Sequence, residues 1–248
     1  MSDIPKILGV IPARYDSTRL PGKVLRDIAG KPMLYWVYRN ARKSRLLADL
    51  LVATDSERVL QFCEREGIPV MLTGRHPSGT DRLREVMERV DADIYINIQG
   101  DEPTLRPEHI EAIVSPFLTP DARVQVATLK VAVDEAAAQD PNNVKVVTDD
   151  RGRALYFSRC PIPFDRDGAG AVKRYKHIGI YAYTRAALTL FHSLTESSLE
   201  SAEKLEQLRF LENGVAIYVV ETPYDTVGVD TEADLERVRL LLSGAERG

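Results

Sequence analysis

The sequence has little cysteine and no long apolar stretch. Its 248 residues include only two cysteines, Cys63 and Cys160, and no Cys-x-x-Cys spacing. Two thiols in a chain of this length do not make a disulfide framework, and they do not indicate a thiolate metal cluster. No run of about 18 apolar residues occurs, and the N-terminal MSDIPK has no cationic segment ahead of an apolar one. These absences predict a soluble, cytoplasmic protein with no membrane insertion.

An excess of positive charge is also missing. The chain has 33 Lys and Arg against 37 Asp and Glu, a formal net charge of -4. General nucleic-acid binding needs a basic face, so this class is disfavoured, although a local basic pocket remains allowed. Hydrophobic residues at 44% and charged residues at 28% are ordinary for a globular protein. A chain of this length can form one sizeable domain, or one domain with a lobe.

Two familiar phosphate-binding patterns are absent as well. Lys23 follows Gly22 but precedes Val24, so the G-x-x-x-x-G-K-[ST] pattern does not occur, and neither does G-x-G-x-x-G. The sequence therefore excludes a Walker-type kinase and a standard dinucleotide dehydrogenase.

What the chain does have is a different cationic loop near its start. The segment 7–23 (ILGVIPARYDSTRLPGK) begins as a buried strand, breaks at Pro12 and continues through Arg14, Arg19 and Lys23. Arg and Lys supply positive charge, and glycine lets backbone N–H groups approach phosphate oxygens. The loop predicts an anion site, and the alternative is a surface loop with solvated cations.

The first half of the chain alternates predicted strands and helices. This alternation predicts an α/β fold with a doubly wound, mostly parallel, Rossmann-like sheet. Ligands bind outside the carboxyl ends of the strands in such sheets, where the loops after Ile11, Ala53 and Ile98 would meet. The predicted strands are 7–11, 49–53, 69–72 and 93–98, and the predicted helices are 33–41, 57–66 (capped by Ser56 and ended by Gly67) and one from Thr80 or Asp81 to about 90.

After Pro120 the pattern changes to strands that follow one another without full helices. We expect a single domain with a smaller antiparallel β lobe at about 124–183, either over the site or at a dimer surface. The predicted strands are 124–131, 144–149, 154–158 and 176–183, with a hairpin turn at 150–153, and helices are predicted at 185–194, 202–213 and 231–242.

Two aspartates, Asp101 and Asp230, each follow a predicted core strand and a glycine. Carboxylate oxygens suit Mg²⁺, which commonly uses one or two carboxylates together with substrate phosphates. The alternative for Asp101 is a turn residue, and for Asp230 an N-cap of the last helix. Thr231 with Asp234 forms its own capping-box pattern, which leaves Asp230 available for a ligand.

A set of motifs in this order resembles the sugar nucleotidyltransferases, and within them the cytidylyltransferases for acidic sugars. The motifs are IPARYDSTRLPGK, ATD, SGTDR, QGDEP, YFSR, HIGIY, LEQLR and GVDTEADLERV, which together span nearly the whole chain. The resemblance implies transfer of CMP from CTP to 3-deoxy-D-manno-octulosonate (Kdo), with release of pyrophosphate, for bacterial lipopolysaccharide biosynthesis. It also implies Mg²⁺ as cofactor and a homodimer.

The resemblance also implies roles for particular residues. It assigns Asp101 and Asp230 to the metal, and Lys23 and Arg14 to the triphosphate as catalytic groups. The implied nucleotide contacts are Ala13, Arg14, Lys23, Gly79, Thr80, Arg82 and Gln99. The plain alternative for the loop 78–82 is helix capping by Thr80.

The acceptor side should hold a sugar acid, and a bidentate cation suits its carboxylate, with Arg159 the leading candidate. His177 and Tyr181 lie four apart on one predicted strand and so share a face. Glu206 and Gln207 lie in an amphipathic helical stretch. The resemblance implies sugar contacts from these residues and from Gln99, and the alternatives are core packing for His177 and Tyr181 and a solvated helix face for Glu206.

The sequence departs from the family pattern at 76–77 (His-Pro) and at 160–164, where Phe164 replaces a frequent tryptophan. These departures keep 8-amino-Kdo open as the acceptor, and a sialic acid enzyme is the nearest competitor. A glycosyltransferase is disfavoured because Asp101-Glu102-Pro103 forms no Asp-x-Asp pair. A non-catalytic nucleotide-sugar-binding protein is disfavoured because Lys23 and both aspartates are present.

Overall fold

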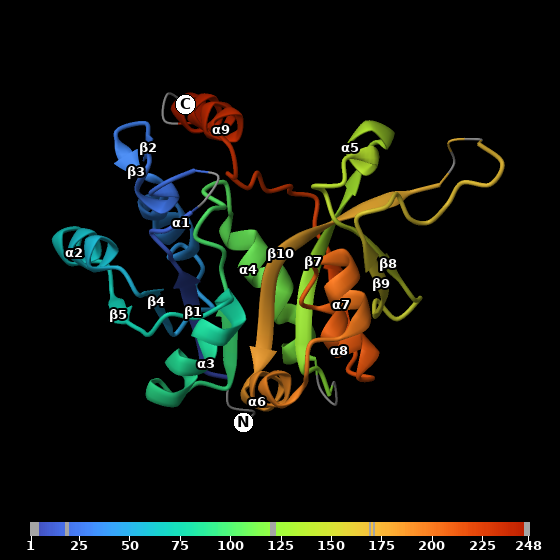
Figure 1. Cartoon of the computed structure of the whole chain (residues 1–248), viewed down its shortest axis with the longest axis horizontal. Coiled ribbons are helices and arrows are strands. Elements are labelled where there is room, and N and C mark those ends of the chain that lie inside the picture. Colours follow the sequence, from blue (N-terminus) through green and yellow to red (C-terminus); the bar gives the residue numbers. More distant parts are fainter. Residues whose placement is uncertain (1–4, 18–19, 120–122, 169, 171, 246–248) are drawn as a thin grey trace. The chain divides into compact units, whose positions relative to one another are not determined.

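The computed structural model describes residues 5–17, 20–119, 123–168, 170 and 172–245, which form two compact units (Figure 1). The first unit contains the chain as far as Glu111 together with the segment from Thr226 onward, and the second unit runs from Ala112 to Asp225. The predicted lobe at about 124–183 lies within the second unit, and the prediction of a single domain stays a prediction. The predicted loop cation Arg19 lies outside the described residues.

The first unit contains the predicted parallel strands, and their order in the sheet is β6-β1-β4-β5. Five of the six residues of β1 are buried. A continuous apolar run of this kind is typical of a parallel strand covered on both faces. The strands are β1 (Ile7–Pro12), β4 (Asp49–Thr54), β5 (Val70–Leu72) and β6 (Ile94–Asn97).

The helices at 33–41, 57–65 and 232–245 confirm the predicted positions, one predicted helix needs a correction, and the helix at 107–114 is one that the sequence analysis does not predict. Helix α3 begins at Gly79 and is capped by Ser78, whose hydroxyl accepts a hydrogen bond from Asp81 N at 3.1 Å, so the predicted start and the cap at Thr80 are wrong. Ser78 takes the cap because its backbone is extended, as an N-cap residue requires. The helices are α1 (Met33–Ala41), α2 (Glu57–Arg65), α3 (Gly79–Arg89), α9 (Glu232–Ala245) and the first part of α4 (Pro107–Val114), within which the chain passes to the second unit.

The end of the cationic loop is shaped by a glycine. Gly22 has a φ of +66°, and a Cβ there would lie 3.3 Å from the Tyr15 ring. Glycine adopts this backbone conformation without the strain a side chain would add. Directly after it come three short elements that the sequence analysis does not predict: the 3₁₀ helix η1 (Lys23–Leu25) and the hairpin of β2 (Asp27–Ile28) and β3 (Lys31–Pro32).

Helix α9 starts with the predicted capping box. Asp234 N donates to Thr231 Oγ1 at 3.2 Å, and Thr231 N donates to Asp234 Oδ2 at 2.8 Å. Leu235 and Val238 of this helix are buried in a cluster with Trp36 and Val229. This packing fixes the start of α9 beside Asp230. The predicted core strand before Asp230 is wrong: the strand β11 (Ile217–Glu221) ends earlier, and 227–229 is an irregular segment held by packing and by the hydrogen bond of Val229 N to Asp101 O.

The second unit contains the predicted antiparallel strands. β10 pairs antiparallel with β7 and β8, β8 pairs antiparallel with β9, and β11, which the sequence analysis misses, pairs parallel with β7. The predicted turn between β8 and β9 is confirmed: Gly152 has a φ of +76° and donates its N–H to Asp149 O at 3.0 Å. The strands are β7 (Val126–Val133), β8 (Lys145–Thr148), β9 (Ala154–Ser158), β10 (Arg174–Thr184) and β11 (Ile217–Glu221).

One predicted helix of the second unit is wrong. The range 202–213 is not continuous, because Lys204 has a left-handed backbone (φ +55°) and ends α7. The side chains of Leu205, in the connection after α7, and of Leu208, the first residue of α8, are both buried, so the chain turns toward the core between the two helices. The helical elements of this unit are η2 (Ser115–Leu118), α5 (Glu135–Gln139), α6 (Arg185–Ser193), α7 (Ser198–Glu203) and α8 (Leu208–Glu212).

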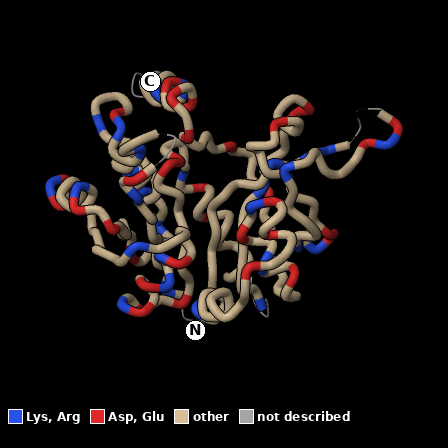
Figure 2. Tube along the Cα trace, in the orientation of Figure 1, with Lys and Arg blue, Asp and Glu red and all other residues tan. Residues whose placement is uncertain are grey.

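Charges of both signs occur along the trace of both units (Figure 2). Within the described part of the chain, no helix combines the length and the apolar character needed to cross a membrane.

Candidate functional site

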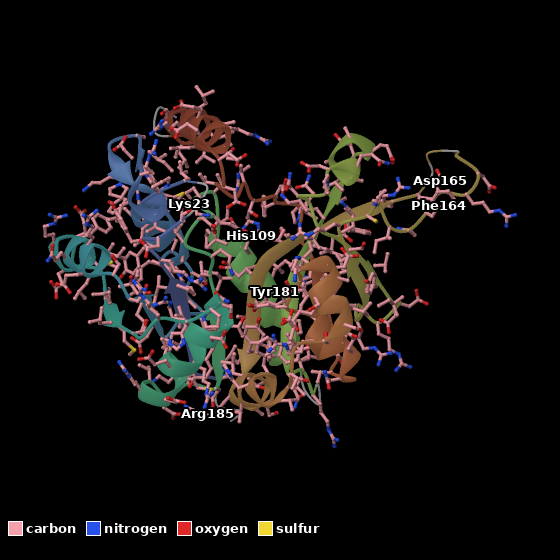
Figure 3. All side chains as sticks on the ribbon, viewed as in Figure 1. Lys23, His109, Phe164, Asp165, Tyr181 and Arg185 are labelled. Carbon is pink, nitrogen blue, oxygen red and sulfur yellow. The ribbon has the colours of Figure 1, made fainter. Side chains whose placement is uncertain are left out.

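The first unit brings one lysine and two aspartates together. Lys23 Nζ donates to Asp101 Oδ2 at 2.6 Å and to Asp230 Oδ1 at 3.0 Å. Lys23 comes from η1 and is labelled in Figure 3. Its side chain is 14% exposed, whereas those of Asp101 and Asp230 are 30% and 46% exposed. Residues 78 and 207 positions from Lys23 in the sequence therefore meet at one ammonium, with the carboxylates open to solvent.

Backbone contacts hold the two aspartates side by side. Val229 N donates to Asp101 O at 2.9 Å, which joins the segment before α9 to the loop after β6. Gly100 lets the same loop approach the end of β1, because a Cβ at this position would lie 2.8 Å from the carbonyl oxygen of Pro12. The glycine of QGDEP thus lets the loop pack against the end of β1.

Asp230 does not cap α9. The backbone N–H groups of Asp230 and Thr231 both donate to Asp234 Oδ2, at 3.1 and 2.8 Å. Asp234 fills the acceptor role at the helix start, so the carboxylate of Asp230 is directed to Lys23 instead. This arrangement confirms the prediction that residues other than Asp230 cap α9.

Burial and the two neighbouring carboxylates shift the pKa of Lys23 in opposite directions. Burial lowers the pKa of Lys23, but the charge of Asp101 and the hydrogen bonds to Asp101 and Asp230 outweigh burial, so its pKa is raised above 10.5. The lysine is held as an ammonium between the two carboxylates.

Arg82 lies fully buried at the start of α3. Its guanidinium forms an ion pair with Asp55 (Nη2 to Oδ1, 3.1 Å), donates to Thr73 Oγ1, and approaches Gly74 O at 3.3 Å. Nε makes no hydrogen bond within the described residues. Burial lowers the pKa of Arg82, and Asp55 partly offsets this effect. Any contact between Arg82 and a nucleotide would therefore come from an arginine already fixed in place by Asp55.

The other predicted nucleotide contacts surround the end of β1. Ala13 N donates to Ala53 O at 2.9 Å, and Arg14 Nη2 donates to Pro77 O at 2.7 Å, just before the cap of α3. Gly79 packs on Asn97, whose amide nitrogen would lie 3.4 Å from an added Cβ. Two further contacts belong to this group: Thr80 is buried in the first turn of α3, and Gln99 Nε2 approaches Asn97 Oδ1 at 3.5 Å.

A cavity of about 400 Å³ adjoins this cluster in the first unit. Arg58 of α2 shapes it by donating to Tyr15 Oη at 2.7 Å and by placing its guanidinium 4.9 Å from the centre of the Tyr15 ring. The lining residues are Arg14, Tyr15, Asp16, Asp55, Ser56, Glu57, Arg58 and Arg75.

In the second unit, His177 and Tyr181 share a face of β10, as predicted. Their ring centroids are 5.3 Å apart, although a register shift lies between Ile178 and Tyr181. From His177 to Tyr181 the chain advances four positions along β10, while their partners on β7, Lys130 and Thr128, are two positions apart. Both steps are even numbers, so the two rings stay on the same side of the sheet. Tyr181 is labelled on β10 in Figure 3.

The hydrogen bonds of Thr128 fix the tautomer of His177. Thr128 Oγ1 is 2.9 Å from His177 Nε2, 3.1 Å from Ile178 O and 2.8 Å from Ile180 O. A hydroxyl has one proton, which a carbonyl takes, so we assign the proton of this contact to Nε2 of His177. Burial lowers the pKa of His177 to about 3. The ring is thus neutral, with Nδ1 as an acceptor.

Tyr181 is buried, and its hydroxyl is available for hydrogen bonding. Burial raises its pKa well above 10, with smaller contributions from Tyr183 and Glu206. Thr128 lies near enough to lower the pKa slightly, but its hydroxyl serves His177 and the backbone. Tyr181 Oη makes no hydrogen bond within the described residues. A buried phenol of this kind is suited to a ligand hydroxyl.

Arg159 is partly engaged by the protein. Its Nε donates to Glu203 O at 2.9 Å and its Nη1 to Pro141 O at 3.1 Å. Glu206 and Gln207 lie in the connection between α7 and α8, so their predicted place in an amphipathic helix is wrong. Gln207 is buried and Glu206 is half-buried.

The structure adds three residues to which the sequence analysis gives no role, although Asp55 belongs to the ATD motif. Asp55 holds Arg82, Asn97 packs under Gly79, and Thr128 orients His177. Asp55 could have been found, because it follows β4 as Arg14 follows β1. Thr128 lies inside a strand of apolar residues and gives no comparable signal.

Two carboxylates converging on one cation are a suitable start for a Mg²⁺ site. The Lys23 ammonium already occupies the point to which Asp101 Oδ2 and Asp230 Oδ1 are directed. Among the described residues there is no group of three or more His, Cys, Asp or Glu that could hold a metal. The residues therefore fit an ion that takes its remaining ligands from phosphates and water, as Mg²⁺ does.

Comparisons with known proteins agree with this geometry. The sequence model of the family described as "Cytidylyltransferase" matches residues 8–217. Proteins named 3-deoxy-manno-octulosonate cytidylyltransferase from Koribacter versatilis and Acidobacterium capsulatum are 55% and 56% identical to this chain. The first match covers 96% of this chain and 90% of the relative, and the second covers 95% and 96%.

A solved structure shares the fold over nearly its full length. The CMP:2-keto-3-deoxy-manno-octonic acid synthetase complexed with CTP has a TM-score of 0.92 and 48% identity, over 97% of this chain and 99% of that chain. These matches confirm the resemblance seen in the motifs and the predicted α/β nucleotidyltransferase fold. The chain belongs to the cytidylyltransferase family.

Proposed function

We propose that this protein transfers CMP from CTP to Kdo, giving CMP-Kdo and pyrophosphate. The observation that carries the proposal is the convergence of Asp101 and Asp230 on Lys23, at the end of a parallel sheet and beside the cationic loop. The relatives named for this reaction, and the CTP complex of a similar enzyme, support the choice of substrates.

In this reaction the anomeric hydroxyl of the sugar acid attacks the α-phosphorus of CTP in line. The hydroxyl oxygen bonds to the α-phosphorus and gives up its proton to solvent, the bond from the α-phosphorus to the bridging oxygen breaks, and pyrophosphate leaves. Lys23 and Arg14 neutralise the charge that builds on the pyrophosphate, and the fixed loop holds the triphosphate in position. Asp101 and Asp230 would hold Mg²⁺, which when bound lowers the pKa of the hydroxyl and screens the phosphate charge.

The proposed nucleotide contacts come from residues of the first unit. Gly79 and Thr80 at the start of α3 bring backbone close to the ligand, and Ala13 contributes a small side chain beside them. Arg82, held by Asp55, and Gln99 offer hydrogen-bond donors. The donors at a helix start suit an anionic or polar ligand.

The proposed contacts to the acceptor sugar come from residues of the second unit. Tyr181 Oη and the Nδ1 of neutral His177 bind sugar hydroxyls, together with Glu206 and Gln207. Arg159 binds the carboxylate through the part of its guanidinium that the two backbone carbonyls leave free.

The proposal also covers the oligomeric state, the cellular location and the pathway. This enzyme acts in the bacterial cytoplasm, supplies lipopolysaccharide biosynthesis and forms a homodimer through the second unit. Support for the dimer comes from Phe164, which is 82% exposed, and Leu155, which is 62% exposed. Phe164, labelled in Figure 3, borders a groove of about 690 Å³ that Val133, Pro161 and Val172 also line. Charged side chains, among them Asp134, Glu135 and Arg174, line this groove as well. An exposed aromatic side chain such as Phe164 is typical of an interface.

The test is pyrophosphate release from CTP and Mg²⁺, with Kdo, 8-amino-Kdo and sialic acid as separate acceptors. Turnover with Kdo well above the other two is the expected result. A preference for another acid would replace the acceptor and keep the chemistry. Absence of pyrophosphate with all three acids would refute the proposed transferase.

A further inference from the structure

The Lys23 ammonium and a divalent cation would compete for the same oxygens. Nζ lies 2.6 Å from Asp101 Oδ2 and 3.0 Å from Asp230 Oδ1, which places it within ion-pair distance of both proposed metal ligands. A cation coordinated by both oxygens would stand where the ammonium stands. Two positive charges cannot share that position, because they repel each other and because the oxygens have few directions to offer.

Lys23 reaches the two aspartates through a flexible four-carbon side chain, so its ammonium can turn away from them while the backbone stays in place. Lys23 lies on a 3₁₀ helix of three residues, directly after Gly22, whose φ of +66° marks a turn. The carboxylates are the more exposed side of the contact, at 30% and 46% against 14% for Lys23. A solute can therefore reach the aspartates from solvent, while Lys23 needs another anion to replace the two it gives up.

We propose that Lys23 is a place-holder for the divalent cation: without nucleotide it occupies the metal position, and a bound triphosphate draws it away and opens that position. This inference rests on the proposed function for the roles of Asp101 and Asp230. It makes metal binding and triphosphate binding mutually favourable. A bound triphosphate draws Lys23 off the aspartates and so favours the metal, and a bound metal displaces Lys23 and so leaves it available for the triphosphate. Lys23 also keeps the two carboxylates close together in the free protein.

The test measures Mn²⁺ binding to the nucleotide-free protein by the electron paramagnetic resonance signal of free Mn²⁺. The variants are Lys23→Met and, as matched control, Lys31→Met, which removes an exposed lysine that pairs with Glu66. We expect Lys23→Met to bind Mn²⁺ at least about tenfold more tightly than the wild type, and Lys31→Met to leave binding unchanged. The double variant Lys23→Met/Asp101→Asn should lose the gain, which locates the ion at the aspartates.

A second arm uses inorganic tripolyphosphate as the anion, after correction for the Mn²⁺ that tripolyphosphate itself binds. It should tighten Mn²⁺ binding to the wild type and have a smaller effect on Lys23→Met. Thermal melting curves establish that each variant is folded.

Equal or weaker Mn²⁺ binding by folded Lys23→Met overturns the inference. So does Mn²⁺ binding to the wild type that is tight and unaffected by tripolyphosphate. Failure of the proposed function is a different result, because it would appear as absence of pyrophosphate release by the wild type, whatever its Mn²⁺ affinity.

Discussion

At the scale of single residues, burial decides what the polar side chains can do. His177 is enclosed by Phe157, with ring centroids 5.0 Å apart, and by Tyr181, and it donates to Thr128. A histidine in these surroundings stays neutral, so it cannot serve as a cation for the sugar carboxylate. Arg159 remains the candidate for that role.

The buried histidine predicts a loss of stability in acid. Its pKa is about 3 in the folded protein and near 6.5 when unfolded, so only the unfolded chain binds the proton between these values. Stability should fall as the pH drops below 6.5, by about 2 kcal/mol between pH 7 and pH 5 from this residue. His177→Asn should flatten this part of the profile, measured by urea unfolding at each pH.

The control for that experiment is Phe157→Leu. This change should lower stability by a similar amount at every pH, since it alters packing without removing a titrating group. An unchanged slope in His177→Asn would show that other groups cause the acid sensitivity.

The two aspartates predict a loss of turnover without a loss of fold. Asp101→Asn keeps the size of the side chain but removes a charge, so Lys23 retains only Asp230 as an anionic partner. We expect pyrophosphate release to fall by about a thousandfold or more, with a melting temperature close to that of the wild type. The comparison is Asp49→Asn, an exposed aspartate at the start of β4, which should keep full activity. Near-normal kinetics of Asp101→Asn would remove Asp101 from the site.

At the scale of elements, close backbone contacts decide where the site forms. The loop after β6 and the segment before α9 meet through the hydrogen bond of Val229 N to Asp101 O, and Gly100 packs on Pro12 O. Neither contact can be inferred from strand or helix patterns, because both join segments that are far apart in the sequence. The capping box of Thr231 and Asp234, in contrast, is local and readable in advance.

Gly100 and Gly228 form a matched pair for testing this packing. A Cβ at Gly100 would lie 2.8 Å from a backbone oxygen, whereas a Cβ at Gly228 would meet nothing within 4 Å. Gly100→Ala should therefore cost about 1–3 kcal/mol and reduce activity, because the neighbouring Asp101 must shift. Gly228→Ala should change the free energy of unfolding little. Urea unfolding of both variants measures the difference, and equal effects would contradict the packing argument.

At the scale of the whole molecule, the proposed dimer depends on exposed apolar side chains of the second unit. Phe164→Asp places a charge where the proposal needs an apolar contact, so it should weaken dimerisation by about tenfold or more. Leu240→Asp is the control, because Leu240 is 77% exposed on α9 of the first unit. Sedimentation velocity over a range of concentrations measures both. A monomeric wild type, or a Phe164→Asp protein that dimerises as well as the wild type, would refute the dimer proposal.

The sequence by itself determined the parallel sheet, most of the helices, the hairpin turn and the family. These features depend on local signals: buried apolar runs, helix caps, glycines at turns and motifs in a fixed order. It missed η1, the β2–β3 hairpin, α4, α5 and β11, and it was wrong where a local pattern met a competing demand. The predicted helix 202–213 is interrupted because the backbone of Lys204 is left-handed and Leu205 is buried. Helix α3 starts before the predicted residue because Ser78, and not Thr80, caps it.

Only the tertiary structure decided which polar groups are engaged and by what. The sequence analysis gives Arg82 as a nucleotide contact, and in the structure it is buried and paired with Asp55. It gives Lys23 as a phosphate contact, and in the structure Lys23 bridges two aspartates. The partner of a charge is set by chain segments that may be 207 residues away. The composition of a short segment cannot carry that information, because burial and electrostatic pairing are properties of the folded chain.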